Sequence, residues 1–169
     1  AVFHPTITIL NAGRIESTHG NFDYYIEGVT PSVALILEEV DKERVKVGEA
    51  LGIRAITARE WLYSAYDAHG RNLFEAIQNN PGYYGIKAPS TIFHRYLTED
   101  IPASLVPISS LGHMLETPTP TIDAIIHLAC VLHGRDYRQE GRTVEKLGLK
   151  GLSVKEIREM VVMEEEEKQ

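Results

Sequence analysis

Charged and acid–base side chains are concentrated in residues 91–102 of this 169-residue chain. His94 and Arg95 form a basic pair, and Glu99 and Asp100 follow as two adjacent carboxylates. Side chains of these types can bind anions or exchange protons, and a junction that leads into a helix can point them into a cleft. The segment is therefore the first candidate for a functional site.

The same segment also has a purely structural interpretation. Pro102 suits the first turn of a helix, so Thr98 or Asp100 can cap that helix, and carboxylates are favoured at its positive end. The helix would carry Ile101 and Leu105 on its apolar side. Local chemistry alone favours capping over catalysis, because capping aspartates are common in helical proteins.

Other reactive residue types form no recognisable site. The seven histidines are dispersed and show no zinc-ligand spacing, so we expect no metal centre. The chain has no Gly-x-Gly-x-x-Gly motif, no phosphate-binding loop, no Cys-x-x-Cys pair and no His-Glu-x-x-His. Cys130 lies in the apolar run 124–132, where we expect a buried hydrophobic side chain rather than a reactive thiol.

The composition argues against several classes of protein. A net charge of -7 and a pI near 5.5, with basic residues scattered along the chain, disfavour nucleic acid as a partner. The first residues do not resemble an export signal, and no apolar run approaches the roughly 18 residues of a membrane span. A single cysteine allows no disulfide framework. We therefore expect a cytoplasmic protein that binds neither membranes nor nucleic acids.

The elements that position these side chains are expected to be helices. Apolar residues recur at steps of three and four, and the alternating pattern of strands is nearly absent. Turn residues separate the helical segments. Apart from one long helix, we expect helices at 5–12, 58–66, 73–79, 102–115, 121–132, 142–147 and 154–163.

The long helix is expected over residues 30–52. Thr30 can cap it, Pro31 suits its first position and Gly52 suits the residue just past its end. Arg44 interrupts its apolar stripe. We expect that arginine to extend to solvent or to form an ion pair, and we give it no catalytic role. Its candidate partners are Glu38, Asp41 and Glu43.

Several stretches taken together resemble the helical C-terminal domain of the NAD(P)-dependent octopine and nopaline dehydrogenase family. Their order and spacing also match, and the similarity covers almost the whole chain outside the last residues. The stretches are FHP at 3–5, NAGRIE at 11–16, YYIEGVTP at 24–31, RYLTEDIP at 95–102, PTPTI at 118–122, GRT at 141–143 and LGL at 147–149.

The resemblance implies an all-α fold, a compact multi-helix domain like the C-terminal domain of opine and 6-phosphogluconate dehydrogenases. Residues 1–163 would form the helical substrate and catalytic domain, and residues 164–169 an acidic, solvated tail. Family members also have an N-terminal Rossmann domain that binds NAD or NADP. We expect that domain to be absent from this chain, which contains no cofactor-binding residues of its own.

The resemblance also assigns the site residues. His4 matches the family's catalytic histidine, Asp100 its aspartate partner, and Arg95 the arginine that holds a substrate carboxylate. Histidine suits the proton transfers of imine formation because its ordinary pKa, about 6.5, lies near neutral pH. A carboxylate on the far ring nitrogen would fix the tautomer, and the planar fork of arginine can hold a carboxylate by two hydrogen bonds.

Two functions remain open at this point. In the first, the chain is the substrate-binding and catalytic half of an opine dehydrogenase, which reductively condenses an amino acid with a 2-oxo acid. That half would pair with a Rossmann domain in the same chain or in a partner, and it could form a homodimer; alone, it would be inactive. In the second, the chain is a stand-alone helical binding or dimerisation module without catalysis.

Overall fold

The computed structural model describes residues 2–166 and is all-α, as predicted. Within this part of the chain β pairing is limited to one isolated antiparallel bridge, between Asp23 and Lys87. None of the helices in residues 2–166 is both long and apolar enough to span a membrane. The elements are α1 (Phe3–Leu10), α2 (Ala12–Thr18), α3 (Pro31–Ala50), α4 (Ala58–Tyr66), α5 (Leu73–Gln78), the 3-10 helix η1 (Pro81–Tyr83), α6 (Arg95–Thr98), the π-helical turn η2 (Ile101–Leu105), α7 (Val106–Met114), α8 (Pro120–His133), α9 (Tyr137–Glu140) and α10 (Val154–Glu166).

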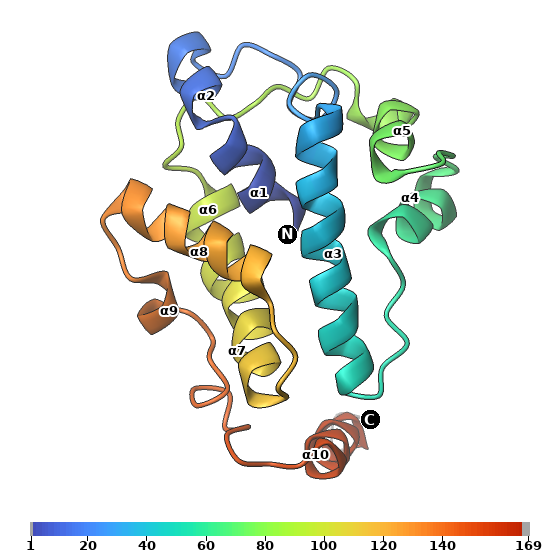
Figure 1. Ribbon diagram of the computed structural model, residues 1–169, viewed down its shortest axis with the longest axis vertical. Helices are drawn as coiled ribbons and strands as arrows, with labels where there is room; N and C mark the ends of the chain where they lie inside the picture. The colour runs from blue at the N-terminus through green and yellow to red at the C-terminus, as the bar shows by residue number, and fades with distance from the viewer. Residues whose placement is uncertain (1, 167–169) are drawn as a thin grey trace.

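The long helix α3 is the axis of the fold, with α4 and α5 on one side and α7 and α8 on the other (Figure 1). Its predicted boundaries are confirmed. The Thr30 hydroxyl accepts a hydrogen bond from the Val33 amide, Pro31 occupies the first turn, and Gly52 follows the end with a positive φ of 71°. Leu37, Val40 and Val47 of its stripe are buried in the core.

Carboxylates of α3 also hold the first turns of three other helices. Each accepts hydrogen bonds from backbone amides that have no partner inside their own helix. The pairs are Glu38 with Leu73 of α5 at 2.8 Å, Asp41 with Ala58 of α4 at 2.7 Å, and Glu43 with Thr121 and Ile122 of α8 at 2.8 and 2.9 Å. A negative charge is favourable at these positive helix ends, so α3 fixes the direction of its neighbours.

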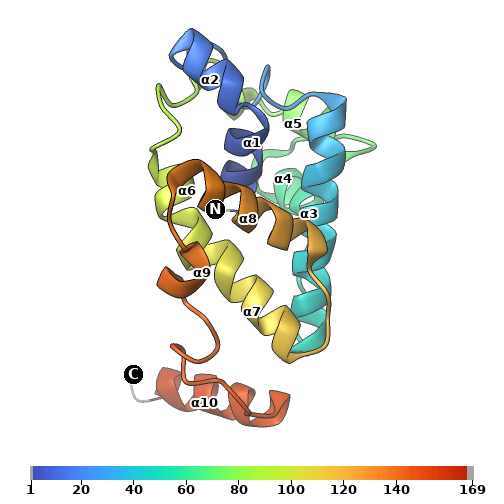
Figure 2. The ribbon, with the colours of Figure 1, turned by 60° about the vertical axis from the view of Figure 1, so that its left-hand side comes forward.

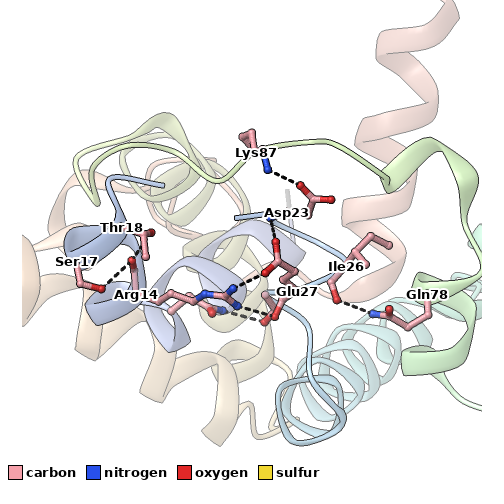
Figure 3. A network of polar contacts seen from close by, with 10 residues as sticks. Arg14, Ser17, Thr18, Asp23, Ile26, Glu27, Gln78 and Lys87 are labelled. Atoms are coloured by element: carbon pink, nitrogen blue, oxygen red, sulfur yellow. Dashed lines mark hydrogen bonds and ion pairs between the residues drawn. The ribbon is translucent and has the colours of Figure 1, made fainter. Parts of the chain in front are cut away.

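The segment 21–30 is held by a network of polar contacts (Figure 3). Glu27 accepts hydrogen bonds from the Arg14 guanidinium and from the Asp23 amide, while Asp23 pairs with Lys87 at 2.9 Å. The Gln78 side chain donates to the carbonyl of residue 26 at 3.0 Å. Most of these contacts are exposed and individually weak, but together they fix a loop that carries two tyrosines into the core.

The structure corrects one helix prediction and redefines another. The helix expected at 142–147 is wrong, because this segment forms only a turn that ends at Gly148, where φ is +71°. The helix expected at 102–115 begins instead as the π-helical turn η2 and becomes α-helical at Val106. The short helices α2, α6 and α9 were not predicted.

Helix α10 lies at one end of the molecule, below α7 and the end of α3 (Figure 2). It includes the first three residues of the stretch 164–169 that we expected as an acidic tail. The last three residues of that stretch lie outside the described part of the chain.

Candidate active site

His4 and Asp100 form a hydrogen bond although 96 positions separate them in the sequence. Nδ1 of His4 lies 2.7 Å from a carboxylate oxygen of Asp100. His4 is in the first turn of α1, and Asp100 is in the short break between α6 and η2. Helices α1 and α6 are in contact, and each contributes a fully buried apolar side chain to the core, Ile7 from α1 and Leu97 from α6. Hydrophobic packing therefore brings the two groups together.

The predicted capping role of this segment is wrong. Neither Thr98 nor Asp100 caps η2 or α7 through its side chain. The Thr98 hydroxyl donates instead to the carbonyl of His94, and the His94 ring accepts from the Tyr96 amide at the start of α6. The Asp100 carboxylate is therefore not engaged in helix capping, and it accepts a hydrogen bond from His4 instead.

Three tyrosines surround the His4 ring. Tyr96 stacks on it with ring centroids 4.0 Å apart, and the Tyr25 hydroxyl lies 2.8 Å from Nε2. The Tyr24 hydroxyl donates to the backbone carbonyl of His4 at 2.9 Å. The side chains of His4 and Asp100 are 24% and 16% exposed, so the pair is shielded without being sealed from solvent.

Burial determines the direction of the His4 pKa shift. Removal of the ring from water lowers the pKa of His4 below its ordinary value, and the hydrogen bond that the ring donates to Asp100 opposes that shift without reversing it. Arg95 adds a smaller lowering through its positive charge. Near neutral pH the ring is therefore mostly neutral, with its proton on Nδ1 facing the carboxylate.

A cleft of about 430 Å³ opens beside His4. Its walls are mainly apolar and aromatic, which suits an organic ligand of small size. The polar groups on it come from His4, Asp41, Arg44 and Thr57 and from the hydroxyls of Tyr25, Tyr66 and Tyr83. The remaining lining residues are Val2, Phe3, Ile56, Ala58 and Trp61.

Arg44 enters this cleft from α3. It donates through Nε and Nη2 to one carboxylate oxygen of Asp41, at 2.9 and 2.7 Å, and also to the carbonyl of Ile56. The ion pair confirms one of the partners expected from the sequence. Its position in the cleft was not expected, because the apolar stripe of α3 gives no sign that a cavity lies beside it. No three metal-ligating side chains cluster anywhere in the described residues.

Arg95 does not line the cleft. It lies on α6 next to Tyr96, is 67% exposed, and pairs with Glu99 at 3.1 Å. It is nonetheless close enough to His4 to lower that residue's pKa. The three residues expected at the site thus divide into a closely bonded pair and a neighbouring surface arginine.

Several residues at the site were not chosen from the sequence. Tyr25 and Tyr96 were noted only as parts of stretches that resemble the family. Trp61 and Tyr83 also line the cleft, whereas Tyr84 turns away and donates to the carbonyl of Gln78 at 2.9 Å. Their spacing in the sequence contains no signal for the site, because tertiary packing alone brings them to His4.

The fold and the site define an all-helical domain with a histidine–aspartate pair beside a ligand-sized cleft. Residues 1–133 match the family described as NAD/NADP octopine/nopaline dehydrogenase, alpha-helical domain. The chain belongs to this family. It is 45% identical over 161 residues to an opine dehydrogenase of Arthrobacter sp. (strain 1C), and 25% identical over 150 residues to the protein ocs of Agrobacterium tumefaciens (strain Ach5). These alignments cover 95% and 89% of this chain.

Solved structures show the same fold. An octopine dehydrogenase in complex with NADH and agmatine superposes with a TM-score of 0.71 at 20% identity, over 92% of this chain and 46% of that one. A second octopine dehydrogenase structure, with NADH and L-arginine, gives a TM-score of 0.65 at 21% identity, over 89% of this chain and 47% of that one. The chain spans 45% of the Arthrobacter enzyme and 42% of the Agrobacterium protein, so it corresponds to less than half of either relative.

Proposed function

We propose that this chain is the substrate-binding and catalytic half of an NAD(P)-dependent opine dehydrogenase, which condenses an amino acid with a 2-oxo acid. The observation that carries the proposal is the His4–Asp100 hydrogen bond at the wall of a ligand-sized cleft. An acid–base pair in such a place is suited to the proton transfers that join an amine to a carbonyl.

In this proposal His4 is the acid–base residue and Asp100 orients it. The carboxylate accepts a hydrogen bond from Nδ1–H, so the proton stays on Nδ1. Nε2 is then the ring atom that takes up or releases a proton. Asp100 also stabilises the imidazolium that forms when Nε2 is protonated. Tyr96 holds the ring from one face, so Nε2 is directed without a change of rotamer.

Arg95 is proposed to bind a substrate carboxylate. Its guanidinium is exposed, and its partner Glu99 is an exposed carboxylate one turn away, so a substrate carboxylate could replace that partner at small energetic cost. A bidentate pair would fix the substrate beside the cleft and hold its reacting carbon in place.

The residues of this chain are suited to catalysing the condensation, but they are not suited to binding a dinucleotide. Residues 2–166 contain no parallel sheet, and the sequence has no glycine-rich turn of the kind that binds a pyrophosphate. NAD or NADP would be held by a Rossmann domain, in the same chain or in a partner. That cofactor supplies the hydride when bound.

The test is turnover by the chain joined to a Rossmann domain of the family. Consumption of NADH or NADPH should require both an amino acid and a 2-oxo acid, and the product should be the secondary amine that joins them. His4→Ala should lower kcat by about 100-fold to 10000-fold, the range of general acid–base catalysis. His19→Ala, in a turn after α2, is the matched control and should retain activity. Absence of turnover with every pair of substrates would favour the alternative of a binding module.

A further inference from the structure

The hydroxyl of Tyr25 is hydrogen-bonded to Nε2 of His4, the ring nitrogen through which His4 is proposed to exchange protons. Nδ1 of His4 faces Asp100 and Nε2 faces Tyr25, so the three side chains form a continuous chain of hydrogen bonds. An ionised carboxylate can only accept, so Nδ1 donates to it. In neutral His4, Nε2 must therefore accept the hydrogen bond that the Tyr25 hydroxyl donates.

We propose that Tyr25 carries protons between His4 and the substrate, as the last member of an Asp100–His4–Tyr25 relay. Tyr25 lines the same cleft as His4. In the relay, a substrate in that cleft exchanges its proton with the Tyr25 oxygen, because Nε2 of His4 is already hydrogen-bonded to that hydroxyl. The inference rests on the proposed function and adds a catalytic residue to it.

The Tyr25 ring is held in place from two sides. It stacks on Tyr83 with ring centroids 4.0 Å apart and an interplanar angle of 13°, and it contacts the edge of Tyr24 at 5.1 Å. The residue is only 8% exposed, and its loop is fixed by the contacts of Asp23 and Glu27. A hydroxyl held this firmly loses little entropy when it transfers a proton.

Burial also determines how Tyr25 can act. It raises the pKa of Tyr25 far above the ordinary value for tyrosine, so a tyrosinate is not a usable intermediate. The hydroxyl must gain one proton as it loses another. This is the behaviour of a relay, and it differs from that of an independent general base.

The protons balance over the condensation. First, the ammonium group of the amino acid gives a proton to the Tyr25 oxygen while the Tyr25 proton passes to Nε2 of His4. The free amine then adds to the carbonyl carbon, and its second proton moves to the carbonyl oxygen. In the return transfer, Nε2 gives its proton to Tyr25 as Tyr25 protonates the departing hydroxyl. The C–O bond breaks, water leaves, and the nitrogen lone pair forms the C=N bond.

The decisive variant is Tyr25→Phe, which keeps the stacked ring and removes only the hydroxyl. In the enzyme joined to its Rossmann domain, kcat should fall by about 100-fold or more while KM changes by less than about threefold, because only proton transfer is lost. Tyr84→Phe is the matched control. Its ring is exposed and does not line the cleft, and its hydroxyl donates to the carbonyl of Gln78 rather than to Nε2, so kcat should be retained.

A second measurement does not depend on turnover. In the 169-residue chain alone, the nitrogen resonance of Nε2 of His4 should shift in Tyr25→Phe, because a hydrogen-bond donor has been removed. It should not shift in Tyr84→Phe. An unmoved Nε2 resonance in Tyr25→Phe would show that the hydrogen bond is absent in solution, and the relay would be abandoned.

The outcomes separate the relay from the function on which it rests. Wild-type turnover with an equal or higher kcat in Tyr25→Phe would mean that substrate reaches Nε2 directly, and it would overturn the relay alone. No turnover by the wild type would overturn both. Turnover by the wild type, with kcat lost in Tyr25→Phe and kept in Tyr84→Phe, would support both.

Discussion

Asp41 connects the wall of the cleft to the start of a neighbouring helix. One of its carboxylate oxygens accepts from Arg44, and the other accepts from the backbone amide of Ala58 at the first turn of α4. Asp41 is buried, so both bonds form largely out of water. A substitution of Asp41 should therefore lower the stability of the domain and alter the shape of the cleft.

Asp41→Asn should lower the free energy of unfolding by about 1–3 kcal/mol, because charge-assisted hydrogen bonds and a helix cap are weakened. Chemical denaturation followed by circular dichroism would measure the change. The matched control is Glu39→Gln on the same helix, since Glu39 pairs only with the exposed Lys42 and should change stability by less than about 0.5 kcal/mol. Equal effects in the two variants would contradict this account of Asp41.

The His4 ring should titrate below about 6.5 in the folded chain, because burial lowers its pKa. Proton NMR of the ring resonances would measure the midpoint. Since the folded state binds this proton less readily than the unfolded state, the stability contributed by His4 is present above about pH 6.5 and is lost as the pH falls below that value. A midpoint above the ordinary value would refute the dominance of burial.

Asp100→Asn should lower the His4 pKa further, because it removes the hydrogen bond and the negative charge that raise it. The same NMR titration, performed on the variant, would detect the change. Asp67→Asn provides the control, since Asp67 pairs with His69 in an exposed turn and should leave the His4 midpoint where it is. An upward shift in Asp100→Asn would show that the carboxylate acts on His4 in some other way.

Arg95→Lys should raise the KM for one of the two substrates by about tenfold, because a single ammonium replaces a bidentate fork. The measurement requires the chain joined to its Rossmann domain. Arg59→Lys is a suitable control, because Arg59 lies on the surface of α4 and donates only an exposed hydrogen bond, to the carbonyl of Arg71. Unaltered kinetics in Arg95→Lys would remove the carboxylate-binding role and leave Arg44 as the cation on the cleft wall.

The chain alone should bind NADH and NADPH more weakly than about 100 μM, since residues 2–166 offer no helix N-terminus after a strand and glycine-rich turn for the pyrophosphate. Isothermal titration calorimetry would measure the affinity. Micromolar binding by the 169-residue chain would contradict the assignment of the cofactor to a Rossmann domain.

The parts of the fold that could be predicted are those with strong local signals. Thr30, Pro31 and Gly52 mark the ends of α3 by capping and backbone conformation, and those boundaries are confirmed. The four-residue helices α6 and α9 are too short to show a 3.6-residue period, so they were missed. The turn at 142–147 has two apolar residues at helical spacing, Val144 and Leu147, but the chain turns at Gly148 before a helix can form.

The site was predictable only in part. Family resemblance singled out His4 and Asp100, which the structure brings into hydrogen-bond contact, whereas local chemistry alone would have left Asp100 as a helix cap. Tyr25 and Arg44 were missed because their roles depend on which elements pack together. No spacing in the sequence encodes a contact between residues 4 and 25 when each lies in a different element.

The three capping carboxylates of α3 also affect how the domain opens. Because Glu38, Asp41 and Glu43 each fix the start of a different helix, loss of α3 would release α4, α5 and α8 together. These helices should behave as one cooperative unit in native-state hydrogen exchange, with shared protection against opening. Helices α3 and α4 of this unit supply one wall of the cleft, through Asp41, Arg44 and Trp61, so that wall should open only when the unit opens.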